Sequence, residues 1–156
     1  MKFTFSWLCD HLDTNKSLNE ICDVLPMLGL EVEDLYNPLD VLAPFLIVEI
    51  VEANQHPDAD RLRVCRVSTG EGELQIVCGA ENARVGLRTV LAPVGAHVPG
   101  LDTVIKQGKI RGQTSEGMLC SLSELGIGED HEGIIELPLD APVGTGFTGF
   151  AQTEYA

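Results

Sequence analysis

The feature that most constrains the fold is a change in hydrophobic period at about residue 40. From there to about residue 140, short apolar and β-branched runs alternate with clusters rich in glycine, proline and acidic residues. Such clusters form turns, and the short runs between them form strands. Many short strands with this punctuation predict a β-sandwich or a β-barrel. The expected strands are 45–51, 62–67, 74–78, 89–92, 104–111, 118–120 and 134–137.

The second of these runs contains a break in its alternation. Leu62 and Val64 share one side of the strand, whereas the next apolar residues are Cys65 and Val67. A shift of one residue indicates a β-bulge, which bends a strand round a small barrel. About 110 residues with five principal strands favour the five-stranded Greek-key barrel called the OB-fold, although spacing alone does not separate it from other barrels.

The first 39 residues have helical patterning instead. Ser6 is expected to cap a short first helix. Ser17 and Glu20 match a capping box at the start of a second helix, and Gly29 supplies a left-handed stop. Because Pro26 has no amide hydrogen, we expect the last turn of that helix to be broken.

Two weaker patterns complete the division of the chain. Residues 31–36 alternate as a short strand would, and the segment after Pro142 has no periodicity and is expected to end without a closing element. The predicted fold is therefore mainly β, with a small helical appendage. Its expected parts are a leader over 1–39, a barrel domain over 40–150 and a truncated tail over 151–156.

Charge is distributed unevenly along the chain. Ten basic and 24 acidic residues give a net charge of −14, which argues against nucleic acid, because phosphate binding requires Lys and Arg. However, residues 61–111 hold eight of the basic residues and four acidic ones, for a net +4. The flanks are acidic, with −10 over 1–60 and −8 over 112–156. A basic middle segment permits a small positive patch.

The sequence contains few motifs typical of catalytic, phosphate-binding or metal-binding sites. The sequence has no Gly-rich phosphate loop and no convincing Cys–His nucleophile pair. His56, Cys65, Cys78 and Cys120 include no local ligand pair, so no metal site is expected. We expect no catalytic residue and no cofactor in this chain.

The cysteine pattern and the hydropathy indicate the compartment. Five widely spaced cysteines without a CxxC pair fit a reducing environment. No apolar run approaches the roughly 18 residues of a membrane span, and the N-terminus does not match a signal peptide. We therefore expect a cytoplasmic location.

A series of short phrases is specific enough to carry a resemblance. They lie at 56–62, 75–82, 109–112, 115–121 and 124–127. In this order they resemble the tRNA-binding OB domain shared by beta subunits of bacterial phenylalanyl-tRNA synthetases, the methionyl synthetase C-terminal extension and free-standing tRNA-binding proteins. Residues 1–8, 27–33 and 130–138 are similar to the start of the phenylalanyl synthetase beta subunit.

This resemblance has several implications. It implies that the chain is the N-terminal part of a longer beta subunit in an alpha2-beta2 ligase. The leader would be half of a small domain, completed by a segment beyond the barrel. ATP and magnesium would be bound elsewhere in the full enzyme. The implied function is a non-catalytic tRNA-binding module for phenylalanyl-tRNA aminoacylation. Its implied partners are tRNA-Phe, the alpha subunit and the remainder of the beta subunit, with no membrane and no DNA.

The resemblance also selects candidate tRNA-binding residues, because matching positions fall on or beside the family's motif. They are Asn82, Lys106, Lys109, Arg111, Ser115 and Met118. Each also has an ordinary structural role open to it: strand-edge solvation for the lysines, core packing for Met118, and turn capping for Asn82 and Ser115.

The physical mode of binding is restricted by the absence of aromatic residues from 51–140. Bases cannot stack on Phe, Tyr or Trp there, so contact would depend on phosphate charge, arginine planes and RNA shape. We expect Lys106, Lys109 and Arg111 to share one exposed face with Arg61 or Arg63, and we expect weak, salt-sensitive binding.

Two alternative functions remain open. The chain could be an assembly module of the synthetase with negligible direct tRNA contact, which the acidic flanks favour. It could also be a free-standing tRNA-binding OB protein.

Overall fold

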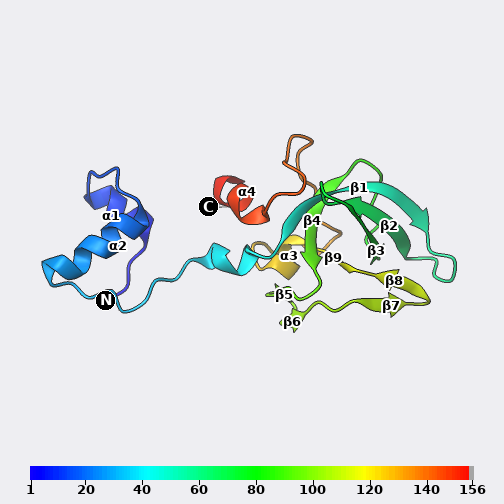
Figure 1. Ribbon diagram of the computed structural model, residues 1–156, viewed down its shortest axis with the longest axis horizontal. Helices are drawn as coiled ribbons and strands as arrows, with labels where there is room; N and C mark the ends of the chain where they lie inside the picture. Colours follow the sequence, from blue (N-terminus) through cyan, green and yellow to red (C-terminus); the bar gives the residue numbers. More distant parts are fainter. Residues whose placement is uncertain (155–156) are drawn as a thin grey trace. The chain divides into compact units, whose positions relative to one another are not determined.

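The structure, a computed structural model, describes residues 1–154 of the chain (Figure 1). It divides into two compact units, Met1–Asn37 and Pro38–Ala156. The first unit is helical and the second contains the barrel. No helix within the described residues is both long and apolar enough to span a membrane.

The first helix of the leader, α1 (Phe5–His11), begins two residues earlier than expected. Thr4 is the N-cap, and its Oγ1 accepts the Trp7 amide hydrogen at 3.2 Å. The predicted cap, Ser6, is wrong: it lies inside the first turn, where its hydroxyl is 3.1 Å from that of Thr4. Both hydroxyl residues are N-cap types, and only the backbone conformation decides between them.

The second helix, α2 (Leu18–Val24), has the predicted capping box. The Ser17 hydroxyl accepts the Glu20 amide hydrogen at 3.3 Å, and the Glu20 carboxylate accepts the Ser17 amide hydrogen at 2.8 Å. Both bonds satisfy amide groups that the start of a helix would otherwise leave free.

The broken last turn is also confirmed. The chain continues from α2 into a 3₁₀ turn, η1 (Leu25–Leu28), which contains Pro26 and ends at Gly29 with a φ of 83°. The strand predicted over 31–36 is wrong, since no strand forms in the described leader. A lone extended segment has no neighbour to complete a ladder of hydrogen bonds.

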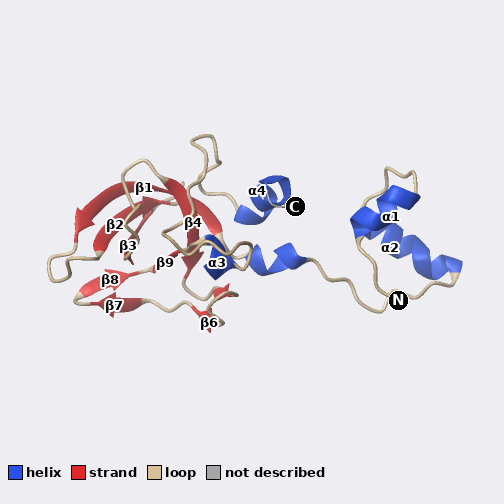
Figure 2. Ribbon diagram, turned by 180° about the vertical axis from the view of Figure 1, so that it is seen from behind, coloured by secondary structure: helices blue, strands red, loops and turns tan. Residues whose placement is uncertain are grey.

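The second unit is a five-stranded antiparallel barrel of the OB type, as predicted (Figure 2). The strands follow the order β3-β2-β1-β4-β9. Their bounds are β1 (Leu46–Gln55), β2 (Arg63–Ser68), β3 (Glu73–Cys78), β4 (Arg88–Pro93) and β9 (Gly117–Leu119). The Glu116 amide donates to the Gln75 carbonyl at 2.9 Å, which brings the chain before β9 against β3 and nearly closes the barrel.

The predicted bulge exists but lies on a different strand. Pairing between β1 and β2 shifts between the Ile50–Val67 pair and the Glu52–Arg66 pair, so the extra residue is Val51 of β1. The register of β2 with β3 has no break. The placement of the bulge on β2 is therefore wrong.

The connection between β4 and β9 forms two small hairpins in place of the single strand predicted over 104–111. Their strands are β5 (His97–Val98), β6 (Thr103–Val104), β7 (Gly108–Ile110) and β8 (Gln113–Ser115). The strand predicted over 134–137 is also wrong: the segment donates backbone hydrogen bonds to Cys120 and Arg88, but its strand pairing is limited to an isolated bridge, Leu137 to Arg88.

Short helices cover part of the barrel. They are η2 (Pro38–Leu42), α3 (Leu122–Leu125) and α4 (Phe147–Glu154). Phe147 is fully buried with Phe45 in one of two apolar clusters. The expectation that the tail ends without a closing element is therefore wrong, because α4 packs this aromatic residue into the core.

Candidate nucleic-acid interface

Two segments distant in sequence meet at one end of the barrel: the β1–β2 loop, residues 56–62, and the β7–β8 hairpin. The His56 ring, only 2% exposed, has Nε2 at 3.0 Å from the Ile110 carbonyl oxygen. The other ring nitrogen, Nδ1, accepts the Asp58 amide hydrogen at 2.9 Å. Because Nδ1 is the acceptor, the proton resides on Nε2 and is donated to Ile110.

The hairpin makes a second contact with the loop. The Arg111 Nη1 donates to the Asp58 carbonyl oxygen at 3.2 Å. Arg111 and Gly112 form the two-residue turn between β7 and β8, with φ values of 49° and 87°. Two consecutive residues with positive φ define the type I′ turn that is usual for tight hairpins.

The opposite strand of the hairpin, β8, is fixed to the barrel wall. The Gln75 amide side chain donates to the Thr114 carbonyl oxygen at 2.9 Å. The Ser115 hydroxyl accepts the Val77 amide hydrogen at 3.1 Å and donates to the Gly117 carbonyl oxygen at 3.0 Å. The β7–β8 hairpin is therefore held at both strands, once by β3 and once by the loop.

The basic residues of the barrel differ in how they are neutralised. Three arginines, all outside the hairpin and the loop, form ion pairs with carboxylates. The pairs are Arg66 with Glu52 and Glu73, Arg84 with Glu136, and Arg88 with Glu49. Hydrogen bonds from the Arg84 and Asn82 side chains lower the pKa of Glu136 to about 2.

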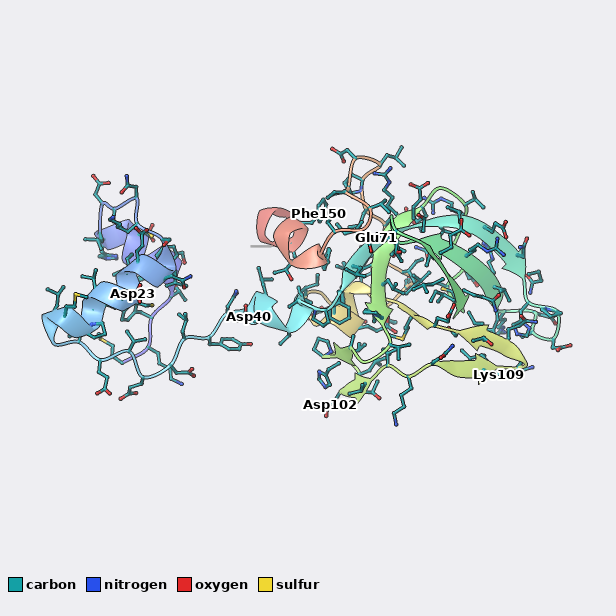
Figure 3. All side chains as sticks on the ribbon, in the orientation of Figure 1. Asp23, Asp40, Glu71, Asp102, Lys109 and Phe150 are labelled. Carbon is teal, nitrogen blue, oxygen red and sulfur yellow. The ribbon has the colours of Figure 1, made fainter. Side chains whose placement is uncertain are left out.

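The remaining basic residues keep an uncompensated charge. Arg61, Lys106 and Lys109 are exposed, and no carboxylate among the described side chains forms an ion pair with them. Arg63 and Arg111 donate to carbonyl oxygens, those of Ala83 and Asp58, which neutralises no charge. Figure 3 shows the Lys109 side chain at the hairpin.

The sequence predicts that Lys106, Lys109 and Arg111 share one exposed face with Arg61 or Arg63, and the structure places each of these residues. The loop–hairpin contact brings Arg111 to the loop that carries Arg61. Lys106 and Lys109 are exposed, and they lie in the same β4–β9 connection as Arg111. Arg63 is half-buried and points its guanidinium at Ala83 instead. The exposed carboxylates of Asp58 and Asp60 lie in the same loop and oppose the positive charge.

Two of the other candidates are occupied by structural hydrogen bonds. The Asn82 amide donates to the Ile134 carbonyl oxygen at 2.8 Å and accepts the Ile134 amide hydrogen at 3.0 Å. Ser115 is buried and ties β8 to β3. Met118 is half-buried against the apolar core. Binding of RNA by all six candidate residues stays a prediction.

Sequence reasoning did not single out His56 as a site residue. A signal was present, because this histidine directly precedes a Pro-Asp turn between two strands, where its ring can accept a turn amide. Its second partner, Ile110, lies 54 residues away and could not be inferred from local spacing.

The buried thiols do not form a reactive site. Burial raises the pKa of Cys65 to about 11 and that of Cys120 to about 12, and it also raises the pKa of Cys78. Thiols with such pKa values remain protonated and are poor nucleophiles near neutral pH.

Comparison with known families matches the barrel to a described domain family. Residues 45–146 match a family model described as "Putative tRNA binding domain". The matched range begins one residue before β1 and ends one residue before α4.

The whole chain is similar to part of a longer protein. It is 56% identical over 156 residues to the phenylalanine–tRNA ligase beta subunit of Gluconobacter oxydans, covering 99% of this chain and 19% of that one. The corresponding subunit of Rhodospirillum rubrum is 58% identical over 144 residues, which cover 92% of this chain and 18% of the relative. The chain thus spans about a fifth of the length of these curated relatives.

A solved structure shares the fold. A MetRS-related protein from Pyrococcus horikoshii superposes with a TM-score of 0.51 and 21% sequence identity, covering 72% of this chain and 97% of that protein. This likeness concerns the barrel architecture alone.

Proposed function

Because the chain belongs to the tRNA-binding domain family, we propose that it is a non-catalytic tRNA-binding module of a phenylalanine–tRNA ligase beta subunit. The observation that carries the proposal is the family match across the barrel, residues 45–146. The surface formed by the loop 56–62 and the β7–β8 hairpin is the binding surface, since OB-folds bind oligonucleotides with the β1–β2 loop and the connection before the last strand.

The chemistry of this surface suits the RNA backbone. Arg61, Lys109 and Arg111 present positive charge without a carboxylate partner in the described chain, and each can neutralise one phosphate. Residues 51–140 offer no aromatic platform for bases, so phosphate contacts position the RNA without reading its sequence.

The proposal extends to the partners of the module. We assign it the remainder of a beta subunit and an alpha subunit in an alpha2-beta2 ligase, with ATP and magnesium bound outside this chain, in the cytoplasm. The leader supports a further segment as partner, because its apolar side chains at Met27 and Leu28 are 82% and 71% exposed. Half of a split domain would bury them once its other half is present.

A second candidate is an assembly module that hardly touches tRNA. The net charge of −14 favours it, since acidic residues repel RNA over a Debye length of about 8 Å at physiological salt. The exposed apolar side chains of the leader fit assembly equally well.

A salt titration separates the two candidates. Fluorescence anisotropy of a labelled tRNA-Phe transcript with the 156-residue chain should give micromolar or weaker binding at about 50 mM salt, largely lost by about 200 mM. A second elongator tRNA should bind with similar affinity. Absence of binding at the lower salt concentration contradicts the tRNA-binding module and favours assembly.

A further inference from the structure

We propose that His56 is a positioning residue: it fixes the β7–β8 hairpin against the loop 56–62, so that Lys109 and Arg111 keep one orientation toward an RNA phosphate backbone. The inference rests on the proposed tRNA-binding function and adds the element that organises the binding surface.

The first step is the weakness of the hairpin by itself. Its strands β7 and β8 have three residues each, and all three residues of β7 are exposed. An isolated two-stranded hairpin is at best marginally stable in water. The hairpin therefore depends on contacts with the rest of the barrel.

The second step is the distribution of those contacts. Gln75 and Ser115 hold β8 against β3. Apart from its pairing with β8, β7 makes one hydrogen bond to another part of the described chain, the bond from His56 Nε2 to the Ile110 carbonyl oxygen. Loss of that bond would leave β7 held by its pairing with β8 and, through the turn, by the exposed Arg111 bond to Asp58, so β7 would fray more readily than β8.

The third step is that His56 is fully used by these two contacts. Both ring nitrogens are hydrogen-bonded and the side chain is buried. The ring thus joins the loop amide of Asp58 to the hairpin carbonyl of Ile110. It cannot itself reach RNA, so any effect on RNA passes through the residues that it holds.

The fourth step is the conformation of the residue next to Ile110. Arg111 has a φ of 49° at the first central position of the turn, where Asn or Gly is usual and an arginine pays a steric cost. Its guanidinium uses one hydrogen-bond donor for the Asp58 carbonyl oxygen, and four further N–H donors remain on the group. An arginine held in this conformation beside Lys109 is consistent with use of its charge.

The test uses two substitutions, each of which keeps one of the two hydrogen bonds of the histidine ring and removes the other. In His56→Gln, the side-chain amide nitrogen takes the place of Nε2 and can still donate to Ile110. In His56→Asn, the shorter side chain can accept the Asp58 amide hydrogen but has no donor that reaches Ile110. Arg66→Gln, which removes an exposed cation already paired with carboxylates, is the matched control.

Two measurements are made on the 156-residue chain: anisotropy with the labelled tRNA-Phe transcript, and hydrogen exchange of the β7 amides. We expect His56→Asn to weaken tRNA binding by about three- to tenfold, the range that one net hydrogen bond supports, and to speed exchange in β7. His56→Gln should restore both to within about twofold of the wild type. Arg66→Gln should leave exchange in β7 unchanged.

The outcomes distinguish failure of the tRNA-binding function from failure of the positioning role of His56. If the wild-type chain does not bind tRNA, the proposed function fails and the positioning role falls with it. If the wild type binds and the two His56 variants are weakened equally, the bond to Ile110 is not the cause and this inference alone is overturned. Should His56→Asn not fold, a His56→Gln variant with fast β7 exchange or reduced affinity overturns it as well.

Discussion

Removal of two positive charges from the hairpin should change the salt dependence of tRNA binding by a calculable amount. Three cations, Arg61, Lys109 and Arg111, lie on the loop and the hairpin without a carboxylate partner in the described chain. Three phosphate contacts give a slope of log affinity against log salt of about −2.1 to −2.7, at 0.7 to 0.9 for each contact. The Lys109→Gln/Arg111→Gln variant retains one contact, so its slope should fall to about −0.7 to −0.9.

The assay is tRNA anisotropy at several salt concentrations between about 50 and 200 mM. Both side chains are exposed, so their replacement by glutamine should leave the barrel folded, which a thermal melt verifies. Arg66→Gln is the control, because Arg66 is already neutralised by Glu52 and Glu73. The slope of the control should match that of the wild type, and both tRNAs should respond alike, since phosphate contacts do not read sequence.

One result would refute this reasoning. If the double variant keeps the wild-type affinity and slope, the hairpin is not the RNA surface. The acidic flanks would then dominate the field near RNA, and the assembly module would be the better description of the chain.

Three further predictions concern residues in and around the barrel. Thr89 has a fully buried hydroxyl without a hydrogen-bond partner among the described residues, so Thr89→Val should raise the free energy of unfolding by about 1 kcal/mol in urea denaturation; a decrease would mean that the hydroxyl is bonded. Arg84→Gln should return the carboxyl pKa of Glu136 from about 2 toward its ordinary value of 4.5, measured by NMR titration. Because the folded-state pKa is depressed, the stabilisation by this pair is complete above about pH 4.5 and is lost as pH falls toward 2; a variant with the same carboxyl midpoint as the wild type would contradict the ion pair. Arg111→Asn should relieve the left-handed turn by about 1 kcal/mol while weakening tRNA binding, and unchanged binding would show that the guanidinium is not used.

Local signals in the sequence identified the start and the end of the second leader helix, as well as the fold class. Ser17 and Glu20 form a capping box because both bonds lie within four residues, which spacing reveals directly. An equivalent pair at Ser121 and Glu124 starts α3 and could have been recognised by the same rule. The bulge could be located only in part. The break in alternation within β2 indicates a change of register between two strands, but only the pairing shows that Val51 of β1 is the extra residue.

The missed features depend on contacts between distant parts of the chain. Helix α4 contains Gly149, which is unfavourable inside a helix, and its Phe147 fills the core beside Phe45. The bond from His56 to Ile110 likewise joins segments 54 residues apart. Propensity and period describe neighbours along the chain, so neither feature was accessible from the sequence alone.

The charge of the chain shows why net charge is a poor guide to partners. With ten basic and 24 acidic residues, the chain has the net charge of a protein that repels RNA. Carboxylates pair with Arg66, Arg84 and Arg88 and compete with phosphate for these cations. Of the cations left without such partners, Arg61 lies on the loop 56–62, and Lys109 and Arg111 lie on the β7–β8 hairpin, which contacts this loop through Arg111. Because exposed charges are screened beyond about 8 Å, the residues within that distance of a phosphate decide whether it binds. Nearby Asp58 and Asp60 limit the affinity, and the acidic residues elsewhere chiefly weaken the approach of RNA at low salt.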